Sequence, residues 1–168
     1  IVLNIDGTPI KDDDTMLDLI ERLASETFMP LCVGGGVRDV DDFGLLLERG
    51  ADKVSVNSAA LERPELITEA ASRYGAQCVV VSIDAKRKAE GGYEVWVDSA
   101  RRATGKEPAA WAAEAARRGA GEILLNSIDR DGSAEGYDLE LIRSVSRAVD
   151  VPVIACGGVG AYQDFPAA

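Results

Sequence analysis

Small polar residues follow two apolar runs of this chain, where strands are expected to end. A glycine triplet ending at Gly36 follows residues 30–33, and Asn57 and Ser58 follow residues 53–56. Backbone N–H groups left open by glycine, together with side-chain donors, can hold a phosphate without a lysine, particularly beside a helix N-terminus. A tight turn at the glycines and helix capping by Asn57 and Ser58 are the structural alternatives. The pattern predicts a phosphate site.

Asp84 is the candidate acid or base. It ends a nearly continuous apolar run, residues 78–83, and the chain contains no histidine, so proton transfer near neutral pH falls to other groups. Barrel enzymes place catalytic groups at such strand ends. The alternative is a structural salt bridge with Lys86 or Arg87.

A second group of strand-end residues forms the other candidate anion site. Asp131 and Gly132 follow residues 122–126, and a glycine beside a carboxylate leaves backbone N–H groups open to a ligand. Gly158 lies in a glycine pair after residues 151–155. We expect these three residues to line the second site.

Short β-branched runs alternate with helical patterns along the chain, which is typical of βα units in a parallel sheet. The expected strands cover residues 1–5, 30–33, 53–56, 78–83, 122–126 and 151–155. The expected helices cover residues 15–25, 40–48, 64–74, 108–118 and 139–148. Residues 86–106 alternate in polarity and predict a small hairpin after the strand that ends near Asp84.

An internal repeat indicates the architecture. A shift of 122 positions, without a gap, gives twelve identities in the first 43 positions, against about three expected by chance. It matches Asn4 with Asn126, Gly36 with Gly158 and Asp42 with Asp164. Such a length holds four βα units, so two halves make an eight-unit barrel. We expect a single α/β domain over residues 1–168 with about six of the eight units, one missing at each end.

Composition narrows the function classes. The 29 acidic and 18 basic residues give a net charge of −11, which disfavours nucleic acid and anionic membranes as partners. Three cysteines, Cys32, Cys78 and Cys156, lie in apolar runs and are expected to be small core residues of a protein in a reducing compartment. No apolar stretch is long enough to span a membrane and no leader is recognisable, so a cytoplasmic location is expected.

Several segments together resemble the cyclase subunit of imidazole glycerol phosphate synthase, a (β/α)8 TIM-barrel enzyme of histidine biosynthesis. They are VGGGV (33–37), RGADKVSVNSAAL (49–61), VVVSIDAKR (79–87), RRGAGEILLNSIDRDG (117–132), GYDLELI (136–142) and ACGGVG (155–160). They cover nearly the whole chain in the family's order. The related isomerase of the pathway shares the barrel and its duplication, but the IDAKR and SIDRDG segments are similar to the cyclase.

The resemblance implies an activity, partners and residue roles. Ammonia from a glutaminase subunit would react with a phosphoribulosyl formimino ribotide, giving imidazole glycerol phosphate and an aminoimidazole carboxamide ribotide, without metal or cofactor. Asp84 would be the acid or base. Lys53 and Glu122, near strand starts, resemble gate residues at the ammonia entrance, or are ordinary ion-pairing residues. The phosphate-binding residues would be Gly36, Asn57 and Ser58 at one end and Asp131, Gly132 and Gly158 at the other.

Departures from the family pattern leave other readings open. Asn4 stands where the family has aspartate, and the second catalytic aspartate falls before residue 1. The chain could therefore be an enzyme, or a non-catalytic phosphate-binding partial barrel that self-associates through open strand edges. A related cyclase-like subunit of surface-sugar amidation is a third reading.

Overall fold

The computed structural model describes residues 1–5 and 8–167. The chain divides into two compact units, Ile1–Val81 with Arg118–Gly121 and Ser82–Arg117 with Glu122–Ala168. Strand β4 (Val79–Arg87) contributes its first three residues to the first unit and the rest to the second. The expectation of a single domain remains a prediction.

The first unit is built from parallel strands with helices between them. Its other elements are β1 (Val2–Leu3), η1 (Ile10–Asp12), α1 (Asp14–Glu26), β2 (Cys32–Gly34), α2 (Val40–Glu48), β3 (Lys53–Val56), α3 (Ser58–Glu62), α4 (Glu65–Tyr74) and η2 (Ala76–Cys78). In register, Val33 of β2 lies beside Val2 of β1 and Val54 of β3, and Val54 lies beside Val79. The predicted parallel arrangement is confirmed here.

Aspartates cap the first two α-helices of this unit, α1 and α2. Asp39 and Asp42 form a capping box at the start of α2, in which each side chain accepts a backbone N–H from the other end of the box. Asp13 caps α1 through Met16 N. Fully buried Phe43 and Leu46 then fix the apolar face of α2 in the core.

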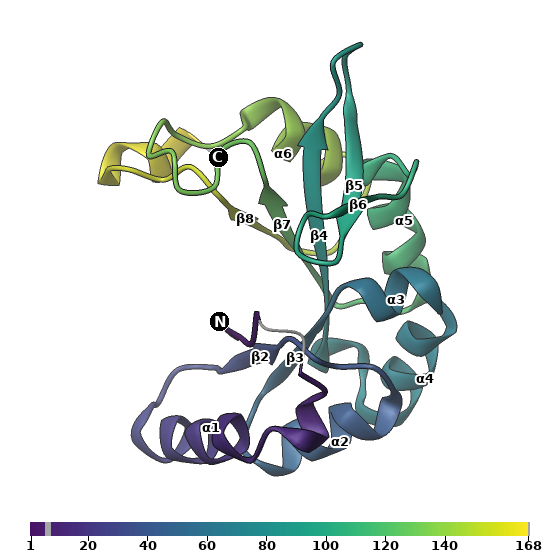
Figure 1. The fold of residues 1–168 in the computed structure, drawn as a ribbon, viewed down its shortest axis with the longest axis vertical. Helices are drawn as coiled ribbons and strands as arrows, with labels where there is room; N and C mark the ends of the chain where they lie inside the picture. Colours follow the sequence, from purple (N-terminus) through teal and green to yellow (C-terminus); the bar gives the residue numbers. More distant parts are fainter. Residues whose placement is uncertain (6–7, 168) are drawn as a thin grey trace. The chain divides into compact units, whose positions relative to one another are not determined.

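The second unit combines parallel strands with a hairpin (Figure 1). Besides β4 it contains β5 (Tyr93–Val97), β6 (Arg102–Ala103), α5 (Pro108–Arg118), β7 (Glu122–Ser127), α6 (Leu139–Ser146), β8 (Val153–Cys156) and η3 (Tyr162–Ala167). Strand β4 runs four residues beyond the predicted end and pairs antiparallel with β5, Asp84 opposite Trp96. Strand β7 pairs with β4 and, in parallel, with β8. Over residues 84–103 the strands pair antiparallel, β4 with β5 and β5 with β6.

The repeat holds for the strands but not for the helices, which corrects the ungapped alignment. A shift of 122 pairs buried Leu17 with Leu139, which is 36% exposed, and Leu19, 42% exposed, with buried Leu141. The capping residues Asp13 and Asp138 instead match at a shift of 125, because each accepts the N–H three residues later. The second loop is three residues longer and the following helix region three shorter, so the strands come back into step.

Two of the three cysteines are not core residues. Cys32 is buried in β2, whereas Cys78 is half-buried and Cys156, at the end of β8, is exposed. Cys78 directly precedes β4, and Cys156 is the last residue of β8. Among the described residues, no helix is long and apolar enough to cross a membrane.

Candidate active site

Asp84 lies where β4 changes partners from the parallel sheet to the hairpin. Its half-buried carboxylate accepts a hydrogen bond of 3.1 Å from the amide Nδ2 of Asn126 in β7. One residue on, Ala85 O accepts the N–H of Ile128, so the β7 backbone follows β4 to this point. A carboxylate in this position, half-shielded from water, can give or take a proton.

Asp131, Cys156 and Gly157 lie close to this pair. Asp131 N donates to Ser127 O, and a Cβ on Gly157 would lie 2.8 Å from the same oxygen. Cys156 is exposed as a residue, but partial burial of its thiol raises the thiol pKa, and the charges of Asp131 and Asp84 raise it further. The carboxyl ends of β4, β7 and β8 thus bring both carboxylates near one thiol.

Asn126 is the residue of this site that sequence reasoning did not select. Its Oδ1 is buried and has no hydrogen-bond partner among the described residues, and a Cβ on Gly157 would come within 3.1 Å of that oxygen. The available signal was its match with Asn4 in the repeat. The match does not identify the hydrogen-bond partner of Asn126, because the equivalent Asn4 Nδ2 donates to the helix-capping residue Asp13, at 2.6 Å, and not to a strand-end carboxylate.

The first unit places Gly36, Asn57 and Ser58 at neighbouring strand ends. Gly34 of β2 pairs with Ser55 of β3, so the chain two residues later reaches Gly36 on one strand and Asn57 on the next. Asn57 occupies the N-cap position of α3 without a cap hydrogen bond from its side chain, and Ser58 is the first helical residue. The sequence did not predict this five-residue helix.

The glycine loops of the two units are built alike. Gly36 and Gly158 both have positive φ, 72° and 100°, and a Cβ on either would collide with a backbone oxygen, of Thr8 or Gly136 respectively. The carbonyl of Gly36 accepts the N–H of Ile10, and that of Gly158 accepts the N–H of Gly136. These glycines are therefore required by a close approach of another loop, at Thr8 for Gly36 and at Gly136 for Gly158.

The same loops end on equivalent carboxylates. Asp42 accepts the N–H of Arg38 at 2.7 Å and of Asp39 at 3.2 Å. Asp164, 122 positions later, accepts the N–H groups of Gly160 and Ala161, which hold its pKa below the ordinary range. In both loops, two successive backbone N–H groups thus donate to one aspartate carboxylate.

Gly132 differs from the other glycines. Its φ is 73°, but nothing lies within 4 Å of a Cβ built on it, and it is exposed together with Asp131. The conformation is therefore not explained by packing. The N–H groups of Asp131 and Ser133 are bonded within the turn, to Ser127 O and Arg130 O, so the open space that a ligand could occupy is the one beside Gly132.

Lys53 and Glu122 begin β3 and β7. Lys53 pairs in register with Cys32 in the first unit, and Glu122 belongs to the second. Both are half-buried at the amino ends of their strands, at the ends opposite the residues described above. The described residues contain no cluster of three or more His, Cys, Asp or Glu side chains suited to a metal ion.

Parallel βα units with polar side chains at the carboxyl ends of the strands define an α/β protein of the TIM-barrel type, of which this chain supplies about six strands of the parallel sheet. Comparison with known families matches residues 1–168 to the family described as histidine biosynthesis protein. The chain belongs to this family, and the predicted fold class is confirmed.

Proposed function

We propose that this chain carries the cyclase activity of imidazole glycerol phosphate synthase: ammonia-dependent ring closure and cleavage of the formimino ribotide. The observation that carries the proposal is the placement of Asp84 beside Asn126, Asp131 and Cys156 at the ends of β4, β7 and β8. Membership of the histidine biosynthesis family supports it at the level of the pathway.

Asp84 supplies the proton transfer in this proposal. Ring closure requires protons to leave the attacking nitrogen and to reach the departing groups, and a single positioned carboxylate can exchange them in turn. Asn126 donates to only one of the two carboxylate oxygens, Oδ1, and so orients the group. Asp84 is the proposed catalytic residue, and Asn126 positions it.

We infer one anion site in each of the two units, each holding one phosphate of the substrate. Gly36, Asn57 and Ser58 form the first, where register brings two neighbouring strand ends together. Asp131, Gly132 and Gly158 form the second. Because the chain as a whole is acidic, backbone N–H groups are the proposed donors. In the second site they are those of Gly132 and Gly158, since the N–H of Asp131 is bonded to Ser127 O.

Two kinds of partner belong to the proposal. A glutaminase subunit would supply ammonia at the strand ends that carry Lys53 and Glu122. The chain by itself would also self-associate, because β1 and β8 each pair with one strand only in the described part, and Leu3 and Ile5 are 44% and 85% exposed.

The test uses the chain with ammonium ions and the formimino ribotide, with product formation followed by chromatography. Turnover that is abolished in Asp84→Asn supports the proposal. Phosphate binding without any turnover would favour the non-catalytic alternative. Turnover of a sugar-linked substrate in preference to the ribotide would favour the amidation pathway.

A further inference from the structure

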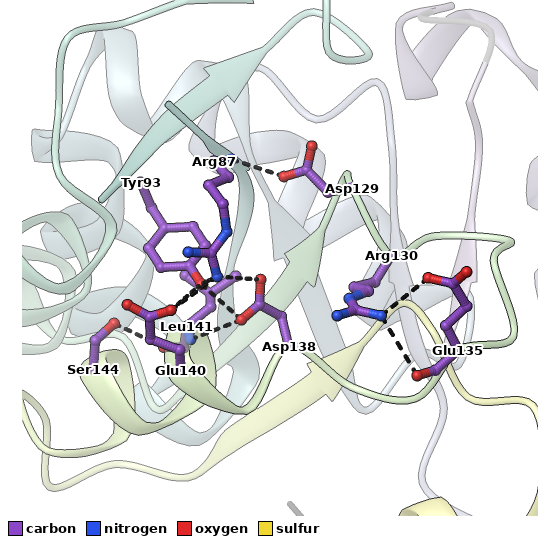
Figure 2. Close-up of polar contacts among 9 residues, drawn as sticks. All are labelled: Arg87, Tyr93, Asp129, Arg130, Glu135, Asp138, Glu140, Leu141 and Ser144. Carbon is purple, nitrogen blue, oxygen red and sulfur yellow. Dashed lines mark hydrogen bonds and ion pairs between the residues drawn. The ribbon is translucent and has the colours of Figure 1, made fainter. Parts of the chain in front are cut away.

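Arg87 contacts both ends of one loop. The loop joins β7 to α6, covers residues 128–138 and is called the β7–α6 loop below. At its start, Asp129 Oδ2 accepts the backbone N–H of Arg87 at 2.7 Å. At its end, the Arg87 guanidinium lies 3.5 Å from Asp138 Oδ2 and 2.9 Å from Glu140 Oε2 (Figure 2).

Asp138, at the far end of the loop, is held by several polar contacts. The carboxylate of Asp138 is buried, its side chain 7% exposed, and it accepts the hydroxyl of Tyr93 at 2.7 Å and the N–H of Leu141 at 3.2 Å (Figure 2). The Arg87 guanidinium also stacks on the Tyr93 ring, 4.6 Å from its centroid. A buried carboxylate with all these partners tolerates little displacement.

The middle of the loop is open. Asp131 and Gly132 are exposed, and Arg130 pairs with Glu135 at 3.1 Å across the loop (Figure 2). The β7–α6 loop is therefore held by contacts at both ends, while Asp131 and Gly132 at its centre are accessible to a ligand. Loops ordered in advance lose less entropy when a ligand binds.

We propose that Arg87 is a positioning residue for one phosphate of the substrate: it braces both ends of the β7–α6 loop and so holds Asp131 and Gly132 ready for the anion. This inference rests on the proposed function and extends it from the residues that touch the ligand to one that does not. The brace acts on binding and takes no part in proton transfer.

The test compares wild type with Arg87→Met, which keeps the length of the side chain, removes the charge that holds Asp138 and Glu140 at the far end of the loop, and leaves the backbone bond to Asp129 in place. Hydrogen exchange of residues 128–138 should become faster by about tenfold. The Kd for inorganic phosphate and the KM for the ribotide should rise by about threefold or more, with kcat within about twofold. Tyr93→Phe, which removes one donor to Asp138, should move the same quantities less.

Arg63→Met is the matched control. Arg63 pairs with Glu69 at 3.2 Å in the first unit and has similar exposure, with 47% of its side chain accessible against 46% for Arg87. Its removal makes the same change in charge and should alter neither the exchange of the β7–α6 loop nor the KM.

Each outcome decides one part of the proposal. Unchanged exchange of residues 128–138 in Arg87→Met would overturn the brace, whatever the protein's activity. Faster exchange with unchanged Kd and KM would overturn its role in ligand binding. A fall in kcat at constant KM would also overturn it. A wild-type chain with neither turnover nor phosphate binding would refute the proposed function, while the exchange measurement would still test the brace.

Discussion

The amide of Asn126 donates 3.1 Å to Oδ1 of Asp84, joining two strands that are 42 residues apart in the sequence. The bond uses the nitrogen of the amide, so the amide oxygen is directed elsewhere, into a buried position beside Gly157. Asn126 therefore occupies Oδ1 of Asp84 as a donor. An asparagine at position 84 also has a side-chain oxygen, so it can accept the same hydrogen bond.

Asp84→Asn should lower kcat by about 10²-fold or more with little change in KM, as expected for loss of proton transfer alone. Stability should hardly change, because asparagine retains an oxygen that accepts from Asn126. Steady-state kinetics and thermal unfolding on the same sample measure both quantities. Asp41→Asn, which removes an exposed carboxylate of the Arg73 ion pair, is the control and should preserve kcat. Normal turnover with a lower melting temperature would mean that Asp84 is structural.

Two glycine substitutions separate packing from backbone strain. Gly36→Ala and Gly132→Ala have nearly the same φ, 72° and 73°, but only the first places a Cβ against a backbone oxygen. Gly132→Ala should therefore cost about 1 kcal/mol of unfolding free energy, and Gly36→Ala about 3 kcal/mol or more. Urea unfolding measures the difference. Equal costs would contradict the close approach of Gly36 to Thr8.

The reactivity of Cys156 reports on the carboxylates beside it. Because burial and the charges of Asp131 and Asp84 raise the pKa of this thiol, Asp131→Asn should lower it and speed alkylation by iodoacetamide at pH 8, by about twofold or more. Mass spectrometry of the Cys156 peptide gives the rate, and buried Cys32 is the internal control. An alkylation rate that does not change in Asp131→Asn would mean that Asp131 does not lie near Cys156, and so does not belong to the Asp84 site.

Tyr93 makes stability sensitive to alkali. Burial, and next the hydrogen bond to Asp138, raise the pKa of Tyr93 above its ordinary value. Above about pH 10 the unfolded tyrosine loses its proton while the folded one keeps it, so stability falls as pH rises. Tyr93→Phe should cost about 1–2 kcal/mol near pH 7 and show a shallower decline above pH 10. Parallel declines in the two proteins would argue against this shift.

The sequence by itself determined the strands of the parallel sheet, the longer helices and their order, but not the short helix α3. The six strands lie where β-branched runs occur, and α2 and α5 coincide with their predicted limits, because capping residues such as Asp39 and the apolar period act within a few residues. Glycines at helix ends, for example Gly50 and Gly75, stop helices through a positive φ that side chains disfavour. These signals are local, so no tertiary contact is needed to read them.

Tertiary structure decided which side chains meet. Asn4 and Asn126 are equivalent in sequence, yet Asn4 binds a helix cap and Asn126 binds Asp84. Strand β7 pairs with β4, which carries Asp84, whereas β1 pairs only with β2 in the described part of the chain. The helices of the repeat are offset by three residues, and an ungapped alignment does not show this offset. It appears only in the burial of the side chains, because Leu17 and Leu141 are both buried although the ungapped alignment does not match them. Likewise, Arg87 reaches Asp129 and Glu140 only because the β4–β5 hairpin lies against the start of α6. Pairing between strands distant in the chain sets such contacts, and local sequence carries no record of them.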